Sequence, residues 1–326
     1  MKNFDLDDIR RAADRINPHI VRTPLLSTPM LDEAAGCKLF VKAEPLQLTG
    51  SFKIRGALNK VLSLDAGRLE RGVVTYSAGN HGQGVAAAAR LVGCPAVIVL
   101  PQTAPAIKID SCRWWGAEIV LYDPQTQQRE AVADKIIEQR GMTFVSPFDD
   151  FDVMAGQGTV GLEICEQLEE RGVSLDALLV NCSGGGLSSG VITAVTAKYP
   201  QAKCYIVEPQ GFEKMAHSLV SGSPERNTSV PKTVMDAISG PVVGTKPLSV
   251  LLRHRLAGIS VNDEEALRAV SAAFRLLKLV VEPGAAASLA AVIEKKVDLA
   301  GKNVAIVCSG GNVDPAIFAR ALTGRQ

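Results

Sequence analysis

Short apolar runs alternate with longer amphipathic segments along most of the chain. The runs are rich in Val, Ile and Leu, which is the pattern of strands buried on both faces of a sheet. The segments between them are rich in Ala, Leu and Glu and have helical spacing. This alternation predicts an α/β fold with mostly parallel sheets. We expect strands at residues 38–42, 73–76, 96–100, 118–122, 177–181, 204–208 and 304–308.

Helical periodicity fills the gaps, most clearly over residues 81–93, 159–172 and 262–278. The last of these segments begins at Asn262, and Glu265 follows three residues later. That spacing predicts a capping box, in which each side chain accepts a backbone N–H of the other residue. Residues 221–244 are rich in Ser, Pro and Gly, and we expect a long irregular connection there.

Charge and cysteine content narrow the class of protein. Lys and Arg total 35 and Asp and Glu total 34, so the net charge of +1 argues against nucleic acid or a membrane as partner. The first 16 residues are charged and lack the apolar core of a signal peptide, so we expect a cytoplasmic location. The seven cysteines are scattered without a Cys-x-x-Cys pair, which predicts reduced thiols and neither a disulfide framework nor a zinc site.

Three expected strands end in unusual loops: "SAGNHGQG" (77–84), "CSGGGLSSG" (182–190) and "SGGNVD" (309–314). Ligands bind beyond the carboxyl ends of strands in open parallel sheets, so we expect the loops to converge on one crevice. The glycine run 184–186 exposes backbone N–H groups before a helix, which suits a phosphate, although an ordinary tight turn has the same composition. Neither nucleotide-binding glycine motif is present, which disfavours a nucleoside cofactor.

Polar side chains in and near these loops are candidates for chemistry. The expected start of a helix carries Ser77, Asn80 and His81, which suit the binding of a small carboxylate. A contact of His81 with the backbone is an equally good interpretation. No His or Cys stands near it at the spacing of a metal site. Ser309 places a neutral hydroxyl at a strand end. Lys53 lies between Phe52 and Ile54, where a surface lysine with a stem covering its neighbours is the commoner case.

The motifs "SFKIRGA" (51–57), "SAGNHGQG", "SGGGL" (183–187) and "SGGNVD", in this order, resemble the fold-type II pyridoxal-phosphate (PLP) enzymes. The nearest branch is the threonine/serine dehydratase and serine racemase family. The resemblance implies a tryptophan synthase β-subunit-like fold of two open, mostly parallel twisted sheets flanked by helices. It also implies a large PLP-binding domain (1–69 and 149–326), a small substrate-closing domain (70–148), and a homodimer or larger homo-oligomer.

The same resemblance assigns roles to individual residues. Lys53 would form the Schiff base with PLP and later remove the substrate's α-proton. Phe52 would lie against the cofactor ring, Asn80 near its phenolic oxygen, and Ser309 at its pyridine nitrogen. The substrate carboxylate would be held by Ser77, Asn80 and His81. The phosphate would be surrounded by Ser183, Gly184, Gly185, Gly186 and Leu187.

The implied activity is a dehydratase that converts a small β-hydroxy amino acid, L-threonine or L-serine, to the 2-oxo acid and ammonia. Arg129 resembles a position that meets a second carboxylate, which makes 3-hydroxyaspartate an alternative substrate; the other interpretation is an exposed arginine paired with Glu130 or Asp134. A PLP-binding protein without turnover and a Rossmann-type oxidoreductase are the alternatives from other classes.

Three departures from the family pattern refine this interpretation. Racemases carry a second serine where this chain has Ala78, so serine racemase is less favoured. Relatives that bind a divalent cation present a Glu and, six residues on, an Asp; here Glu208 is followed by Lys214, so we expect that metal site to be absent. The family's Asp-Gly is Asp236-Ala237 here, and the extra methyl group reshapes the expected wall beside the cofactor.

Overall fold

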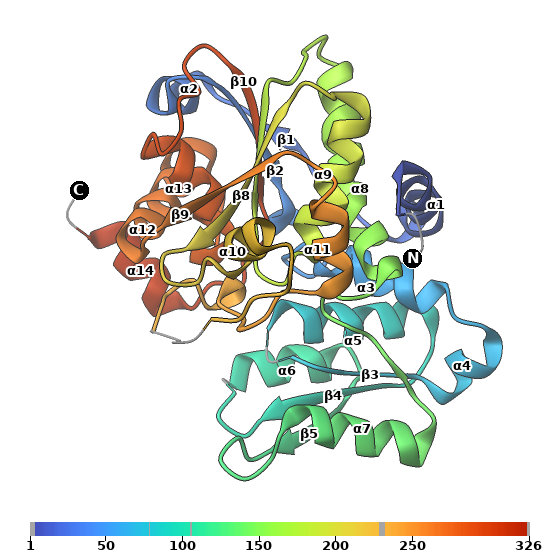
Figure 1. Cartoon of the computed structure of the whole chain (residues 1–326). Coiled ribbons are helices and arrows are strands. Elements are labelled where there is room, and N and C mark those ends of the chain that lie inside the picture. Colours follow the sequence, from blue (N-terminus) through green and yellow to red (C-terminus); the bar gives the residue numbers. More distant parts are fainter. Residues whose placement is uncertain (1–3, 78, 105, 228–231, 325–326) are drawn as a thin grey trace.

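The computed structural model describes residues 4–77, 79–104, 106–227 and 232–324. Two sheets, each flanked by helices, make up the molecule (Figure 1). The strands are β1 (Leu25–Leu26), β2 (Lys38–Ala43), β3 (Val73–Tyr76), β4 (Ala96–Pro101), β5 (Glu118–Tyr122), β6 (Thr143–Phe144), β7 (Ala177–Asn181), β8 (Lys203–Pro209), β9 (Leu256–Val261) and β10 (Asn303–Cys308).

The helices are α1 (Leu6–Ile16), α2 (Pro29–Ala35), α3 (Lys53–Leu62), α4 (Ala66–Arg71), α5 (Asn80–Val92), α6 (Ala106–Trp114), α7 (Arg129–Arg140), α8 (Phe151–Glu169), α9 (Gly186–Lys198), α10 (Lys214–Ser221), α11 (Thr245–Leu251), α12 (Asp263–Ala272), α13 (Ala287–Ile293) and α14 (Pro315–Thr323). Short 3-10 turns and one π turn occur between them. Within the described residues no helix combines the length and apolarity needed to cross a membrane.

The larger sheet has the order β1-β2-β10-β7-β8-β9, and β1 is its antiparallel strand. Helices α12 and α13 cover one face, where Val270 and Leu289 are fully buried. Helices α8 and α9 cover the other face through Ile164 and Ile192 (Figure 1). Apolar layers on both sides explain why its central strands are near-continuous runs of Val, Ile and Leu.

The smaller sheet is fully parallel in the order β5-β4-β3-β6. Helix α5 packs on one face together with α3, and Val85 and Leu58 are buried in that layer. Helix α7 covers the opposite face through Ala133 and Ile136. Its strands lie within residues 73–144, while the proposed domain boundaries at 70 and 148 stay a prediction.

All seven expected strands are present. Three have the expected bounds, three extend by one residue at one end, and β8 extends by one residue at each end. The expected capping box is confirmed, because Asn262 Oδ1 accepts Glu265 N at 3.0 Å and Glu265 Oε2 accepts Asn262 N at 2.8 Å. The unexpected strands are β1 and β6, of two residues each, and the edge strand β9, which contains Ala257 and Gly258.

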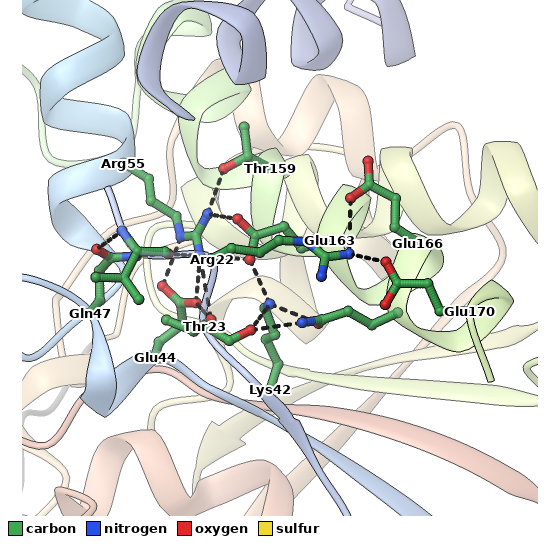
Figure 2. A network of polar contacts seen from close by, with 12 residues as sticks. Arg22, Thr23, Lys42, Glu44, Gln47, Arg55, Thr159, Glu163, Glu166 and Glu170 are labelled. Carbon is green, nitrogen blue, oxygen red and sulfur yellow. Dashed lines mark hydrogen bonds and ion pairs between the residues drawn. The ribbon is translucent and has the colours of Figure 1, made fainter. Parts of the chain in front are cut away.

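A buried ionic network fixes the start of α3 (Figure 2). Arg55 donates to Glu44 from Nε at 2.8 Å and from Nη2 at 2.9 Å, and to Glu163 from Nη1 at 2.7 Å. Lys42 Nζ donates to Glu163 Oε2 at 2.5 Å. Burial opposes the charge on Arg55, but Glu44 and Glu163 outweigh it and raise the pKa of the guanidinium.

This network joins three elements that are far apart in sequence. Glu44 follows β2, Arg55 lies in α3, and Glu163 lies in α8. The side chains of Arg55 and Glu44 are fully enclosed, so a break would leave an uncompensated charge in an apolar interior. The start of α3, which carries Lys53, is therefore held against both the larger sheet and α8.

Replacing Arg55→Met is expected to lower the free energy of unfolding by about 3–5 kcal/mol, because Glu44 would lose its buried partner. Urea denaturation followed by circular dichroism measures the change. The matched control is Arg268→Met, which removes a half-exposed arginine paired with Glu294 and should cost less than about 1 kcal/mol. Equal small losses for both variants would contradict an anchoring role for the buried network.

Candidate active site

Lys53 is the first residue of α3, and its amine points to the connection between β6 and α8. Lys53 Nζ donates to Pro147 O at 2.9 Å and stands 5.2 Å from the centroid of the Phe52 ring. Burial lowers the pKa of Lys53 to about 8, against the opposing effect of the carboxylate of Glu282. An amine with this pKa has a substantial neutral fraction near neutral pH, and the neutral form is the nucleophile and the base.

Glu282 is a buried carboxyl that joins this lysine to the loop after β3. Its Oε1 accepts Asn80 Nδ2 at 2.6 Å, and the Asn80 Oδ1 accepts Asn312 Nδ2 at 2.8 Å. Burial raises the pKa of Glu282 to about 7, and the hydrogen bond from Asn80 opposes this rise. The amide of Asn80 is therefore oriented from both ends by groups of the larger sheet's loops.

His81 is buried and neutral. His81 Nε2 is 3.0 Å from Val145 O, so this nitrogen carries the hydrogen and Nδ1 is an acceptor with no hydrogen-bond partner. Burial and the nearby charge of Lys53 lower the pKa of His81 to about 3. The donors for a carboxylate at this place are the backbone N–H groups at the start of α5, which lack partners inside the helix. Ser77 Oγ already accepts Gly79 N at 3.2 Å.

The glycine run after β7 leads directly into α9 and has no room for side chains. A Cβ on Gly184 would stand 2.4 Å from the ring of Phe148, and one on Gly185 would stand 2.5 Å from Met215 Cε. Gly185 has φ of +94°, a conformation that favours glycine. Backbone N–H groups at the start of a helix form a cradle for an anion, so residues 183–187 fit a phosphate.

Ser309 directly follows β10, and the glycine run follows β7, the neighbouring strand of the larger sheet. Ser309 Oγ accepts Asn181 Nδ2 at a long 3.4 Å, which leaves the hydroxyl hydrogen available to a ligand. Nearby, Phe52 N donates to Ser309 O at 3.1 Å, which fixes the Lys53 segment to the end of β10. Ser51 Oγ is buried without a hydrogen-bond partner. Its hydroxyl is therefore free to form a hydrogen bond with a ligand.

The structure brings the three expected loops together, although not at one sheet. The loop 77–84 follows β3 of the smaller sheet, whereas the other two loops follow β7 and β10 of the larger sheet. Asn80 and Asn312 form the direct link. Ala78 lies outside the described residues.

Arg129 lies apart from this group, at the first position of α7. Its side chain is 45% exposed, and its Nε donates to Glu130 Oε1 at 2.8 Å. Its guanidinium also stacks over the Tyr76 ring, 4.8 Å from the centroid. Tyr76 precedes Ser77, so Arg129 borders the loop after β3.

The comparisons with known proteins agree with this arrangement. The sequence profile of a family described as "Pyridoxal-phosphate dependent enzyme" matches residues 16–310. This chain belongs to that family. The match covers the first three motifs and the first two residues of the fourth. The family membership establishes PLP as the cofactor class.

Individual relatives divide among several activities. The L-threo-3-hydroxyaspartate ammonia-lyase of Saccharomyces cerevisiae is 35% identical, with 98% of this chain and 96% of the relative covered. The L-threonine ammonia-lyase of Thermotoga maritima is 39% identical, with 97% and 78% covered. The solved structure of maize serine racemase superposes with a TM-score of 0.90 at 36% identity, with 98% and 96% covered. The fold is therefore that of fold-type II PLP enzymes, as expected from the motifs.

The residues present fit PLP. The amine of Lys53 would hold its aldehyde carbon, residues 183–187 its phosphate and Ser309 its ring nitrogen. Sequence reasoning missed Glu282 and Pro147, which complete the surroundings of Lys53 and Asn80. No glycine motif or helical period marks either residue, and only their contacts in the fold identify them.

The protein without cofactor should take up PLP at a rate that rises with pH, is half-maximal near pH 8 and levels off above that pH. The neutral amine of Lys53 is the reacting form, and its pKa of about 8 lies below the 10.5 of an ordinary lysine. Stopped-flow absorbance in the visible region measures the rate.

The variant Glu282→Gln removes the carboxylate that raises the pKa of Lys53, so its midpoint should move to lower pH. A rate that keeps rising toward pH 10.5, or an unchanged midpoint in this variant, contradicts the assignment.

Proposed function

We propose that the protein is an ammonia-lyase that converts L-threonine or L-serine to the 2-oxo acid and ammonia. The observation that carries the proposal is the partly buried amine of Lys53, tethered to Pro147 and close to Glu282. A binding protein would not require a nucleophilic amine with a lowered pKa. Matches to threonine ammonia-lyase sequences and structures support this activity at the level of the family.

Each residue has a definite task in this proposal. PLP, when bound, withdraws the electrons left at the α-carbon after its proton is removed. Lys53 Nζ takes that proton in its neutral form. The backbone N–H groups at the start of α5 bind the substrate carboxylate, and the doubly held amide of Asn80 orients the cofactor's oxygen. The β-hydroxyl then leaves as water, and hydrolysis of the resulting imine gives the 2-oxo acid and ammonia.

Ser309 favours elimination in this scheme. A hydroxyl at the ring nitrogen shares a hydrogen bond without holding that nitrogen positively charged, as an aspartate would. Negative charge is then retained less on the ring, and loss of the β-hydroxyl competes better with reprotonation. The sequence also lacks the second serine of racemases at position 78, so serine racemase is the less favoured activity.

A second candidate is an ammonia-lyase for L-threo-3-hydroxyaspartate. It is favoured by the stacking of Arg129 over Tyr76, which places a guanidinium beside the loop that begins at Ser77. The pairing of Arg129 with Glu130 offsets part of its charge and favours the first candidate. The relatives in Saccharomyces cerevisiae and a Pseudomonas species support this second substrate.

Release of 2-oxo acid from L-threonine, L-serine and L-threo-3-hydroxyaspartate at equal concentration tests the proposal. We expect the largest kcat/KM with threonine or serine. Lys53→Ala should abolish release and the visible absorbance of the bound cofactor. Product from none of the three substrates, or turnover by Lys53→Ala, contradicts the proposed activity.

Arg129→Met distinguishes the two candidates. If L-threonine or L-serine is the substrate, this variant should change kcat/KM by less than about twofold, because the arginine is half-exposed and already paired. If hydroxyaspartate is the substrate, loss of a charge-assisted bond should reduce its kcat/KM by roughly 10- to 100-fold. Arg140→Met, at the other end of α7 and paired with Glu118, is the control and should affect neither substrate.

A further inference from the structure

A buried ammonium lies behind the glycine run. Lys214 is the first residue of α10, and its side chain is 0% exposed. Lys214 Nζ stands 3.6 Å from Glu208 Oε1 and has no hydrogen-bond partner. A lysine amine in such a place has three donors to satisfy and a large desolvation cost, so its retention needs a physical reason.

The fold places this ammonium next to the start of the phosphate cradle. Glu208 follows Val207 in β8, and Cys182 N donates to Val207 O at 2.8 Å. Burial raises the pKa of the Cys182 thiol to about 12, and Glu208 and Lys214 both act on it. On the other side, Met215 Cε stands 2.5 Å from the Cβ position of Gly185. The sequence neighbours of the pair, Val207 and Met215, therefore border both ends of residues 182–185.

The negative member of the pair is engaged elsewhere. Glu208 Oε1 accepts Met215 N at 3.0 Å, and Oε2 accepts Ala216 N at 2.9 Å. Burial raises the pKa of Glu208, and Lys214 and the two backbone N–H groups oppose this rise. Glu208 is thus shared between Lys214 and two backbone N–H groups, and Lys214 Nζ is left without a hydrogen bond.

A divalent cation does not fit this place, although the family resemblance associates Glu208 with one. The position six residues on carries an ammonium instead of a carboxylate, and an ammonium repels a cation and cannot ligate it. Across the described part of the chain, no group of three or more His, Cys, Asp and Glu could hold a metal ion. The amine of Lys214 occupies this position instead.

We propose that Lys214 is a built-in cation that stabilises the phosphate of PLP from behind residues 183–187, and that no divalent cation acts at this place. Lys214 does not touch the cofactor, so it is a positioning residue that acts through the electrostatic field and through Met215. The proposal uses only the cofactor of the family and is independent of which amino acid is the substrate.

Lys214→Met tests the charge with little change in side-chain volume. Its affinity for PLP should fall roughly tenfold, a value typical of opposite charges separated by a layer of protein, and the 31P resonance of bound PLP should shift. Its affinity for pyridoxal, which lacks the phosphate, should stay unchanged. Ser218→Ala is the matched control, because it removes a buried hydrogen bond to Lys214 O within α10 and leaves the charge in place.

An equal loss of affinity for PLP and pyridoxal in Lys214→Met would show that Lys214 only supports the fold. No loss for either compound would show that Lys214 does not act on the phosphate. Both results overturn the proposal. If Lys214→Met does not fold, Glu208→Gln serves instead. This variant leaves the ammonium without its negative partner, so the ratio of PLP to pyridoxal affinity should rise or stay constant, and a fall overturns the proposal.

The wild-type protein provides an independent measurement. Treatment with a chelator followed by addition of Mg²⁺ should leave its PLP affinity and 31P resonance unchanged. A loss of PLP affinity on chelation that Mg²⁺ restores would show that a metal ion supplies the charge, contrary to the proposal.

Discussion

The buried guanidinium of Arg55 is the constraint on which the site depends. It is bound by carboxylates from two other elements, Glu44 after β2 and Glu163 in α8. Separation of any of these elements would expose a charge to an apolar interior, so α3 begins at one fixed place relative to the larger sheet. Lys53 stands two residues before Arg55. The amine proposed to react thus takes its position from an ionic contact that has no part in the proposed chemistry.

The lowered pKa of Lys53 comes from its burial. Burial alone disfavours the ammonium, and Glu282 limits how far the pKa falls. Glu282 is itself buried, which raises its pKa, and the hydrogen bond from Asn80 opposes this rise. The pKa values of Lys53 and Glu282 are therefore coupled, and Asn80 acts on that of Glu282 through its hydrogen bond.

Sequence patterns predicted the parts of this protein that depend on local interactions. The central strands are uninterrupted apolar runs, and Asn262 with Glu265 caps a helix through contacts three residues apart. Strand β9 was missed because Ala257 and Gly258 interrupt its pattern at a sheet edge. The glycine loops were recognised as a set, but their union across two sheets depends on long-range packing. Glu282 was missed for the same reason, since its role comes from contacts more than 200 positions away.

The charges around the site differ in how firmly they are fixed. Lys214 and Arg55 are enclosed, and their partners lie on strands and helices of the larger sheet's framework. Arg129 is half-exposed at the start of α7 and rests on Tyr76. A buried charge cannot be changed without a large cost, whereas an exposed arginine can be replaced with little effect on folding. Under the second candidate function, this division would let one cofactor framework be retained while the residue that meets the substrate side chain varies. Relatives of similar identity are named for different substrates.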